Sequence, residues 1–405
     1  MKSFVCIEIK PNIYWNVLND RTTDLFEGIL PISKEGVSYN SYIIVDYKVA
    51  LIDLVKGIKT DDFLSQIEEV VDPSTVDYVI INHMEPDHTG MIKTMRKIAP
   101  NVTLVGSAKT KEMLKSYYQI DTNFMVVKTG DTINLGTHEL VFYDMPWVHW
   151  PETIATYEKK SKILFSCDAF GSYGALGGSI FSDEYEDLNF YKEEALRYYA
   201  NIVAKFSRFV IKAIESLKDL DIQIIAPSHG LIWRNPKEII DLYYKWASYS
   251  QKPAELGVTL LYASMYGNTE KMMGSVVQGL SKEGIPVKIF DVARIHVSYI
   301  LPYLWKYQGV LIGTPTYETK LFPPMAYVLS MATYKRIIRK ELARFGSYGW
   351  SGGAQRDLEA RVEKLKWNLF DSFEFCGGPT PEDFEKGEEL GRMFAKHLKE
   401  TNNNL

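Results

Sequence analysis

The chain has 405 residues, of which 46% are hydrophobic and 24% are charged; this composition is that of a globular protein and excludes a disordered or fibrous chain. Its length favours two domains. The formal net charge of −5 argues against nucleic acid as a partner, because phosphate backbones are bound by basic surfaces. No apolar run reaches the roughly 18 to 20 residues that span a bilayer, and the N-terminus lacks the apolar core of a signal peptide. We therefore expect a cytoplasmic protein with no membrane segment.

The three cysteines, Cys6, Cys167 and Cys376, lie far apart and do not suggest a disulfide framework. No CxxC pair is present, which excludes a zinc ribbon or a rubredoxin-type iron site. Three thiols are also too few for an iron–sulfur cluster held by four thiolates of this chain. Any metal must therefore be bound by histidines and carboxylates.

In chain order, the first part of the sequence is rich in short apolar runs. These runs predict strands at residues 42–45, 49–52, 76–81, 102–106 and 139–143. Helical periodicity follows over residues 189–217, with Ala195, Tyr198, Tyr199, Ile202, Phe206 and Phe209 on roughly one face.

The pattern changes after the polar stretch at residues 251–253. Strands are predicted at residues 258–263, 287–292, 310–313 and 345–348, with helices at 269–282 and 381–398. A regular alternation of this kind indicates a doubly wound parallel sheet with right-handed crossovers. We expect one domain over residues 1–250 and a second over residues 251–405.

The first part also carries potential metal ligands that directly follow apolar, strand-like runs. They are His83, Glu85, Asp87 and His88 in one short motif, then His149, Asp168 and His229. Each of His149 and His229 alone is equally compatible with a structural role. Together, seven imidazoles and carboxylates at strand ends would be costly to bury without a metal, so the set predicts a metal centre.

This ligand pattern resembles that of the metallo-β-lactamase superfamily, HxHxDH…H…D…H, which holds two metals. Glu85 stands at the position of the second histidine, and the resulting HxExDH pattern is similar to that of the flavodiiron proteins. The resemblance implies an αββα sandwich with one iron on His83, Glu85, His149 and Asp168. It implies a second iron on Asp87, His88, Asp168 and His229, with Asp168 and a hydroxide bridging the two.

The ligand chemistry also favours iron over zinc. A carboxylate in place of an imidazole moves the site toward harder oxygen ligands. Three carboxylates and a bridging hydroxide would balance the charge of two ferrous ions. Asp53, which ends an apolar run, is either an acceptor for a ligand imidazole N–H or a turn-capping residue.

Three loops of small, hydroxylated and aromatic residues follow strands in the second part. The first loop spans residues 264–269, the second 313–317 and the third 346–354. The first contains no Lys or Arg, so a phosphate there would rely on the Ser264 and Thr269 hydroxyls, backbone N–H groups and a helix N-terminus, with Gly267 permitting close approach. The crevice at the carboxyl ends of parallel strands is the usual ligand site of such sheets.

The three loops resemble the phosphate loop and the two ring-flanking loops of flavodoxins, which implies bound FMN. The residues expected to contact it are Ser264, Met265, Tyr266, Gly267, Asn268, Thr269, Pro315, Thr316, Tyr317, Ser347, Tyr348, Gly349, Trp350, Gly352 and Gly353. Tyr317 and Trp350 are the candidates to flank the flavin ring, with ordinary packing as the alternative. Glu318 departs from the family, in which Asn often follows the tyrosine, and its effect on the flavin potential is left open.

The resemblance covers essentially the whole chain and implies the minimal two-domain class of flavodiiron proteins. Such proteins pass electrons through FMN to a di-iron site that reduces dioxygen to water or nitric oxide to nitrous oxide. The segments FEGILPISKEGVSYNSYII and HMEPDH are more similar to the methanogen branch, which takes electrons from reduced coenzyme F-420; rubredoxin is the alternative donor. Tyr198 and Tyr199 are the candidate neighbours of the di-iron site.

Domains of about 250 and 150 residues have radii of gyration of roughly 18 and 15 Å, which would separate two sites in one subunit. We therefore expect a head-to-tail homodimer or a dimer of such dimers. The sequence leaves two other classes as alternatives, a zinc hydrolase with an accessory flavodoxin domain and an electron carrier or sensor with a degenerate metal site. Glu85 and the complete ligand set argue against them.

Overall fold

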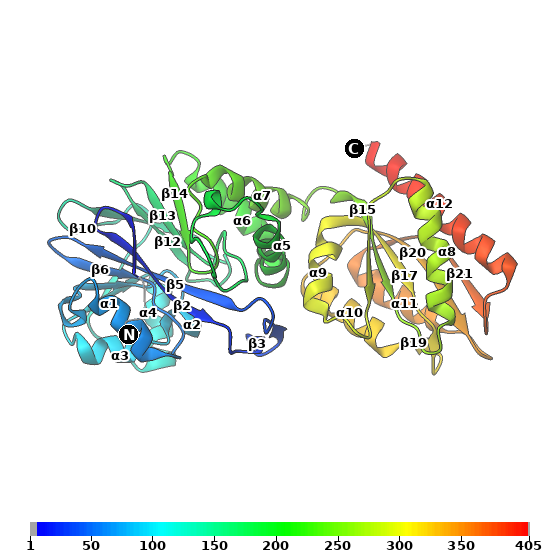
Figure 1. The fold of residues 1–405 in the computed structure, drawn as a ribbon, viewed down its shortest axis with the longest axis horizontal. Helices are drawn as coiled ribbons and strands as arrows, with labels where there is room; N and C mark the ends of the chain where they lie inside the picture. Colours follow the sequence, from blue (N-terminus) through cyan, green and yellow to red (C-terminus); the bar gives the residue numbers. More distant parts are fainter. Residues whose placement is uncertain (1–5, 404–405) are drawn as a thin grey trace. The chain divides into compact units, whose positions relative to one another are not determined.

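The computed structural model of the chain describes residues 6–403. Contacts between residues divide the chain into two units, Met1–Lys245 and Trp246–Leu405. The division falls within helix α7 (Pro236–Ser248), ahead of the polar residues 251–253 where the sequence analysis placed the boundary (Figure 1).

Two β-sheets form the centre of the first unit. The seven-stranded sheet has the order β1 (Ile7–Lys10), β2 (Ile13–Asp20), β5 (Val37–Val45), β6 (Val49–Ile52), β7 (Tyr78–Ile80), β8 (Thr103–Gly106) and β9 (Phe124–Val126). The five-stranded sheet has the order β10 (Thr132–Asn134), β11 (Glu139–Asp144), β12 (Ile154–Glu158), β13 (Ile163–Cys167) and β14 (Ile224–Pro227). A short separate hairpin, β3 (Leu25–Phe26) and β4 (Leu30–Pro31), lies in the connection from β2 to β5.

Apolar side chains of both sheets share one core, because each sheet turns an apolar face toward the other. Tyr42 of β5 and Phe165 of β13, for example, pack with ring centroids 5.0 Å apart. The outer faces carry α1 (Thr60–Glu68), α3 (Ile92–Ile98) and α4 (Ala108–Tyr118) on one side and α5 (Asn189–Tyr198), α6 (Ser207–Leu217) and α7 on the other (Figure 1). The expected αββα sandwich is confirmed.

The predicted long helix over residues 189–217 is interrupted. Between α5 and α6 the chain forms a π-helical turn (Tyr199–Val203) and a 3₁₀ turn (Ala204–Phe206). These turns change the helical register, so that Ser207, Val210, Ala213 and Leu217 form the buried face of α6. Phe206 and Phe209, which the 3.6-residue period placed on the buried face, are only half-buried.

The second unit contains one parallel sheet, as predicted. Its order is β16 (Val287–Asp291), β15 (Glu255–Tyr262), β17 (Tyr307–Gly313), β20 (Glu341–Tyr348) and β21 (Asn368–Cys376), and all four neighbouring pairs are parallel. A hairpin of β18 (Thr316–Tyr317) and β19 (Lys320–Leu321) follows β17. The helices are α8 (Asn268–Lys282), α9 (Val297–Lys306), α10 (Pro323–Tyr334), α11 (Ala354–Val362) and α12 (Pro381–Asn403). This is the doubly wound arrangement, with the edge strand β21 added to the four predicted strands.

Within residues 6–403, no helix is both long enough and apolar enough to cross a membrane. Cys6, Cys167 and Cys376 are free thiols, and their wide spacing in the sequence suggested no disulfide framework.

Candidate functional site

The seven predicted metal ligands follow strands of both sheets in the first unit. His83 and Glu85 lie in the loop after β7, and Asp87 and His88 lie in the short helix α2 (Pro86–Thr89) that continues it. Asp168 directly follows β13, and His229 follows β14. His149 lies in the connection from β11 to β12. The sandwich therefore brings together residues from four separate segments of the sequence.

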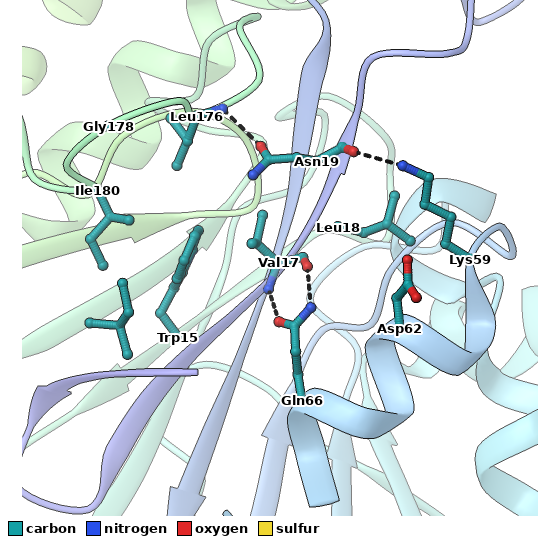
Figure 2. A pocket seen from close by; sticks show the side chains of 11 residues that line it. Trp15, Val17, Leu18, Asn19, Lys59, Asp62, Gln66, Leu176, Gly178 and Ile180 are labelled. Carbon is teal, nitrogen blue, oxygen red and sulfur yellow. Dashed lines mark hydrogen bonds between the residues drawn. The ribbon is translucent and has the colours of Figure 1, made fainter. Parts of the chain in front are cut away.

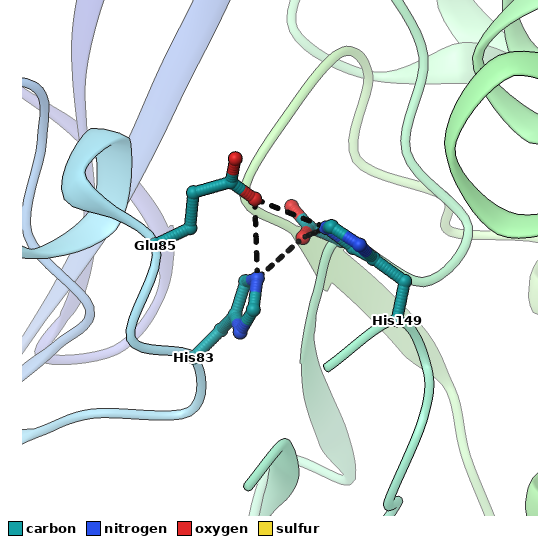
Figure 3. A group of neighbouring side chains, drawn as sticks. His83, Glu85 and His149 are labelled. Carbon is teal, nitrogen blue, oxygen red and sulfur yellow. Dashed lines mark hydrogen bonds and ion pairs between the residues drawn. The ribbon is translucent and has the colours of Figure 1, made fainter. Parts of the chain in front are cut away.

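His83, Glu85, His149 and Asp168 form the first group. The Nε2 atoms of His83 and His149 lie 3.3 and 3.1 Å from Oε2 of Glu85. The same two nitrogens lie 3.3 and 3.1 Å from Oδ2 of Asp168. Figure 3 shows both imidazole edges directed at the Glu85 carboxylate. Four donor atoms thus converge on one point that a metal ion can occupy.

The second group uses the other oxygen of Asp168. Oδ1 of Asp168 lies 2.9 Å from Nε2 of His88 and 3.2 Å from Nε2 of His229. The Asp87 carboxylate lies 3.4 Å from each of these nitrogens. Because its two oxygens face different groups, Asp168 is placed to bridge two metal ions.

Several donor atoms in these groups are buried without a hydrogen-bond partner. They are both carboxylate oxygens of Asp87, Oδ2 of Asp168 and Nε2 of His149 and His229. Burial alone would lower the pKa of His149, but the carboxylates of Asp168 and Glu85 outweigh it and raise the pKa to about 9. The chemistry of the donors and their unsatisfied atoms fit a pair of bound cations.

Glu152, which was not predicted from the sequence, contacts His83 on the side of the imidazole that faces away from Glu85 and Asp168. Its Oε1 accepts hydrogen bonds from Nδ1 of His83 at 2.6 Å and from the backbone N–H of Met84 at 2.9 Å. Because this hydrogen bond keeps the proton on Nδ1, Nε2 of His83 has a lone pair that can bind a metal. Its position three residues after His149 was the only signal in the sequence that could have pointed to it.

His229 is oriented in the same way, because its Nδ1 donates to the backbone oxygen of Ser38 at 2.8 Å. Asp53 lies close by, but its carboxylate accepts from the backbone and side-chain N–H groups of Asn82 and from the Ser228 hydroxyl. Asp53 therefore holds the residue that precedes His83 in place, and of its two alternative roles these contacts do not support the acceptor of a ligand imidazole N–H.

The two candidate tyrosines, at the junction of α5 and the π turn, pack against different neighbours. The Tyr198 ring packs on His229 with centroids 5.5 Å apart. The Tyr199 ring packs on Tyr243, and its hydroxyl is hydrogen-bonded to the Ser207 hydroxyl at 2.7 Å. Of the two, Tyr198 therefore borders the predicted metal ligands, as does Tyr39, whose ring centroid lies 5.6 Å from that of His229.

A cavity of about 310 Å³ opens beside the two groups. Glu85, Asp87, Glu27 and Lys56 supply its charged lining, and Leu25, Phe26, Tyr39 and Pro86 supply its apolar lining. A separate cavity of about 420 Å³ lies over β2 and α1, where Gln66 bonds both the N–H and the C=O of Val17 (Figure 2). None of the predicted site residues lines that second cavity.

The three loops of the second unit follow β15, β17 and β20 at the carboxyl ends of adjacent parallel strands. The Thr269 hydroxyl of the first loop bonds the Ser347 hydroxyl of the third at 3.0 Å. Gly267 has a φ of +85°, and a Cβ there would meet no protein atom within 4 Å, which leaves room for a ligand. Trp350 is 93% exposed and Tyr317 is 37% exposed, so two aromatic rings border this crevice without being buried in the protein. These features fit a bound flavin phosphate and ring.

Comparison with known proteins agrees with both units. Residues 37–230 match the family model "ODP family beta lactamase", and residues 260–391 match the flavodoxin model. The chain is 32% identical to a nitric oxide reductase of Moorella thermoacetica over 96% of each chain.

Among solved structures, rubredoxin oxygen:oxidoreductase from Desulfovibrio gigas is similar, with a TM-score of 0.91, 28% identity and coverage of 98% of this chain and 99% of that one. A mutant flavo di-iron protein from Thermotoga maritima has a TM-score of 0.88 and 30% identity, with coverage of 98% of both chains. A lactamase-like unit followed by a flavodoxin unit matches these proteins over 96% or more of their length. The chain belongs to the flavodiiron protein family.

Proposed function

We propose that this oxidoreductase reduces dioxygen to water at a di-iron centre bound by His83, Glu85, Asp87, His88, His149, Asp168 and His229, with electrons supplied through FMN. The observation that carries the proposal is the division of the Asp168 carboxylate between two groups of ligands beside one cavity. When bound, the irons would hold a small oxidant, and FMN would deliver electrons to it.

The chain's own residues would position and enclose this chemistry. Glu152 and the Ser38 carbonyl keep the Nε2 lone pairs of His83 and His229 directed at the metals. The Tyr198 ring, which is 1% exposed, packs on His229 and would help to exclude bulk water. The apolar wall of the cavity, including Leu25 and Phe26, suits a small uncharged substrate.

Nitric oxide is the second candidate substrate, because it is also small and uncharged. The similarity to the Moorella thermoacetica protein, which is named a nitric oxide reductase, favours it. The seven ligands would be the same for both substrates, so the choice between them depends on the cavity wall and on Tyr198.

For the electron donor we propose reduced coenzyme F-420, on the resemblance of the N-terminal and HMEPDH segments to the methanogen branch. Rubredoxin is the alternative, and the name of the Desulfovibrio gigas relative supports it.

We also propose a head-to-tail homodimer, or a dimer of dimers, in which the FMN of one subunit serves the irons of its partner. Exposed apolar side chains on the hairpin beside the metal groups support an interface there. Leu25 is 44% exposed and Ile29 is 54% exposed. Full turnover by a monomer at high dilution would contradict this arrangement.

The decisive experiment mixes the full chain, loaded with iron and FMN, with reduced coenzyme F-420 in the absence of oxygen. A limited pulse of dioxygen follows, and in a parallel sample a pulse of nitric oxide, while flavin and deazaflavin absorbances are recorded. We expect rapid flavin reduction and oxidation of two coenzyme molecules, each a two-electron donor, per dioxygen, without hydrogen peroxide.

If rubredoxin but not the coenzyme reduced the flavin, rubredoxin would be assigned as the donor, and the proposed reduction of dioxygen would stand. Faster consumption of nitric oxide than of dioxygen would favour the second substrate. A protein purified from metal-balanced medium that binds zinc rather than iron and consumes neither gas would overturn the proposed function.

A further inference from the structure

Arg344 is a fully buried arginine beneath the third flavin loop. It lies on β20, and its side chain has no exposed surface. Its Nη2 donates to Oε1 of Glu374 on β21 at 2.8 Å, and its Nη1 donates to Oε1 of Gln355 in the first turn of α11 at 3.1 Å. The guanidinium therefore joins β20, β21 and the helix that begins where the third loop ends.

The third loop lies directly against this ion pair. A Cβ at Gly346 would be 2.7 Å from Nη2 of Arg344, and one at Gly352 would be 3.1 Å from Oε2 of Glu374. Glycine at 346 therefore lets the chain approach the guanidinium more closely than a residue with a Cβ would, and at Gly352 a Cβ would require the carboxylate to move by a few tenths of an ångström.

The same loop also contacts the continuation of the second loop. A Cβ at Gly353, whose φ is +137°, would be 2.3 Å from the backbone oxygen of Thr319 in the β18–β19 hairpin. The backbone N–H of Leu321 in that hairpin donates to Asp357 of α11 at 3.1 Å. Movement of the third loop would therefore displace the hairpin that carries Tyr317.

We propose that Arg344 and Glu374 are positioning residues for FMN: their ion pair holds the third loop, and through it Trp350 and Tyr317, in the arrangement that accepts the flavin ring. This proposal depends on FMN binding to the second unit and not on the identity of the substrate or donor.

The pair suits this role because neither partner is easily replaced. Arginine presents a planar fork that reaches two acceptors at once, whereas lysine offers a single point charge. The Glu374 side chain is 24% exposed, so without its partner it can turn toward solvent and release the loop. Burial lowers the pKa of Arg344, which shows that this charge is costly to keep in place without the Glu374 carboxylate.

The test measures flavin binding to the full-length apoprotein, prepared by removing FMN, by quenching of flavin fluorescence. Both FMN and riboflavin, which lacks the phosphate, are titrated. We expect Arg344→Lys and Glu374→Gln each to weaken the binding of FMN and of riboflavin at least tenfold. Within each variant the two affinities should fall by the same factor, and the midpoint potential of bound FMN should shift. The equal effect follows because the third loop borders the ring and the first loop receives the phosphate.

Two controls separate positioning from general destabilisation. Ser264→Ala should weaken FMN binding more than riboflavin binding, because its hydroxyl belongs to the phosphate loop and accepts from backbone N–H groups of Gly267 and Glu270 there. Arg392→Gln removes the exposed Arg392–Glu389 pair on α12 and should change neither affinity nor potential. Should Arg344→Lys fail to fold, Glu374→Gln at its half-buried position carries the test alone. Flavin affinities within twofold of the parent chain and an unchanged potential in the folded variants would overturn the proposal.

Discussion

The Nδ1 of His83 donates to Oε1 of Glu152 over 2.6 Å, and both side chains are buried away from water. The two residues are 69 positions apart, and their contact decides which nitrogen of His83 faces the metal groups. The second hydrogen bond to Oε1, from the N–H of Met84, shows that the carboxylate is the acceptor.

Replacing this carboxylate should weaken metal binding while leaving the fold in place. For Glu152→Ala we expect a loss of about 10- to 100-fold in metal affinity, because His83 is no longer held in the binding tautomer. Titration of the metal-free protein with ferrous ion measures it. Glu158→Gln is the matched control, since Glu158 bonds Nδ1 of the buried His138 outside the metal groups. Equal affinity in the Glu152 variant and the parent chain would remove Glu152 from the site.

Removing Asp168 should affect both metals at once. In Asp168→Ala the iron content should fall from about two per chain to near none, with loss of oxidase activity, because each group loses one oxygen ligand. His149→Ala should mainly deplete the first group. FMN content, read from flavin absorbance, should stay at the parent level because the flavin loops lie in the other unit. Normal turnover in either variant would show that the ligand assignment is wrong.

Tyr198, the last residue of α5, and Tyr199, the first residue of the π turn, form a natural pair for a selectivity test. Tyr198→Phe removes the hydroxyl of the ring that packs on His229. If that hydroxyl bonds one substrate and not the other, the ratio of dioxygen to nitric oxide turnover should change by about fivefold, the effect of one hydrogen bond. Tyr199→Phe should leave the ratio unchanged and cost about 1 kcal/mol of stability, because it loses the bond to Ser207. An unchanged ratio in both variants would exclude the tyrosine hydroxyls from selectivity.

The stability of the first unit should depend on pH through Glu194. Burial raises the pKa of this carboxyl to about 7; the adjacent Arg197 opposes the shift and Glu35 adds to it. Since the folded pKa exceeds the unfolded value, the folded state binds more protons between about pH 4.5 and 7. This contribution to stability is complete below pH 4.5 and is lost as the pH rises through 7.

Glu194→Gln should remove that slope, so its unfolding free energy should exceed that of the parent at pH 7.5 by on the order of 1–3 kcal/mol and match it near pH 4.5. Urea unfolding at a series of pH values measures both. Glu193→Gln, at an exposed position of the same helix, should keep the slope of the parent chain. Identical slopes in all three proteins would contradict the assignment to Glu194.

Trp350 should matter to flavin binding and little to folding. Because its ring is 93% exposed, Trp350→Ala should change the unfolding free energy of the apoprotein by less than about 0.5 kcal/mol. A ring that stacks on the flavin contributes about 0.5–1.5 kcal/mol, so FMN affinity should fall by roughly 2- to 13-fold. Tyr334→Ala, at an exposed aromatic of α10, is the control and should bind FMN normally.

Much of this architecture was readable from the sequence because its signals are local. The short motif from His83 to His88 and the small residues of the first loop are contiguous, and the strands that carry them are apolar runs. The exchange of one histidine for Glu85 was enough to favour iron over zinc, since ligand chemistry belongs to the residue itself.

Other features depended on packing between distant segments. The π turn that begins at Tyr199 has no counterpart in the 3.6-residue period used to predict the helix. The division of the Asp168 oxygens, the contact of Glu152 with His83 and the buried pair of Arg344 and Glu374 join residues from different strands and loops. Residue type and spacing determined which groups were available to bind iron and flavin; the packing of whole sheets and helices decided which atoms meet, because the free energy of a long-range contact depends on the entire core that surrounds it.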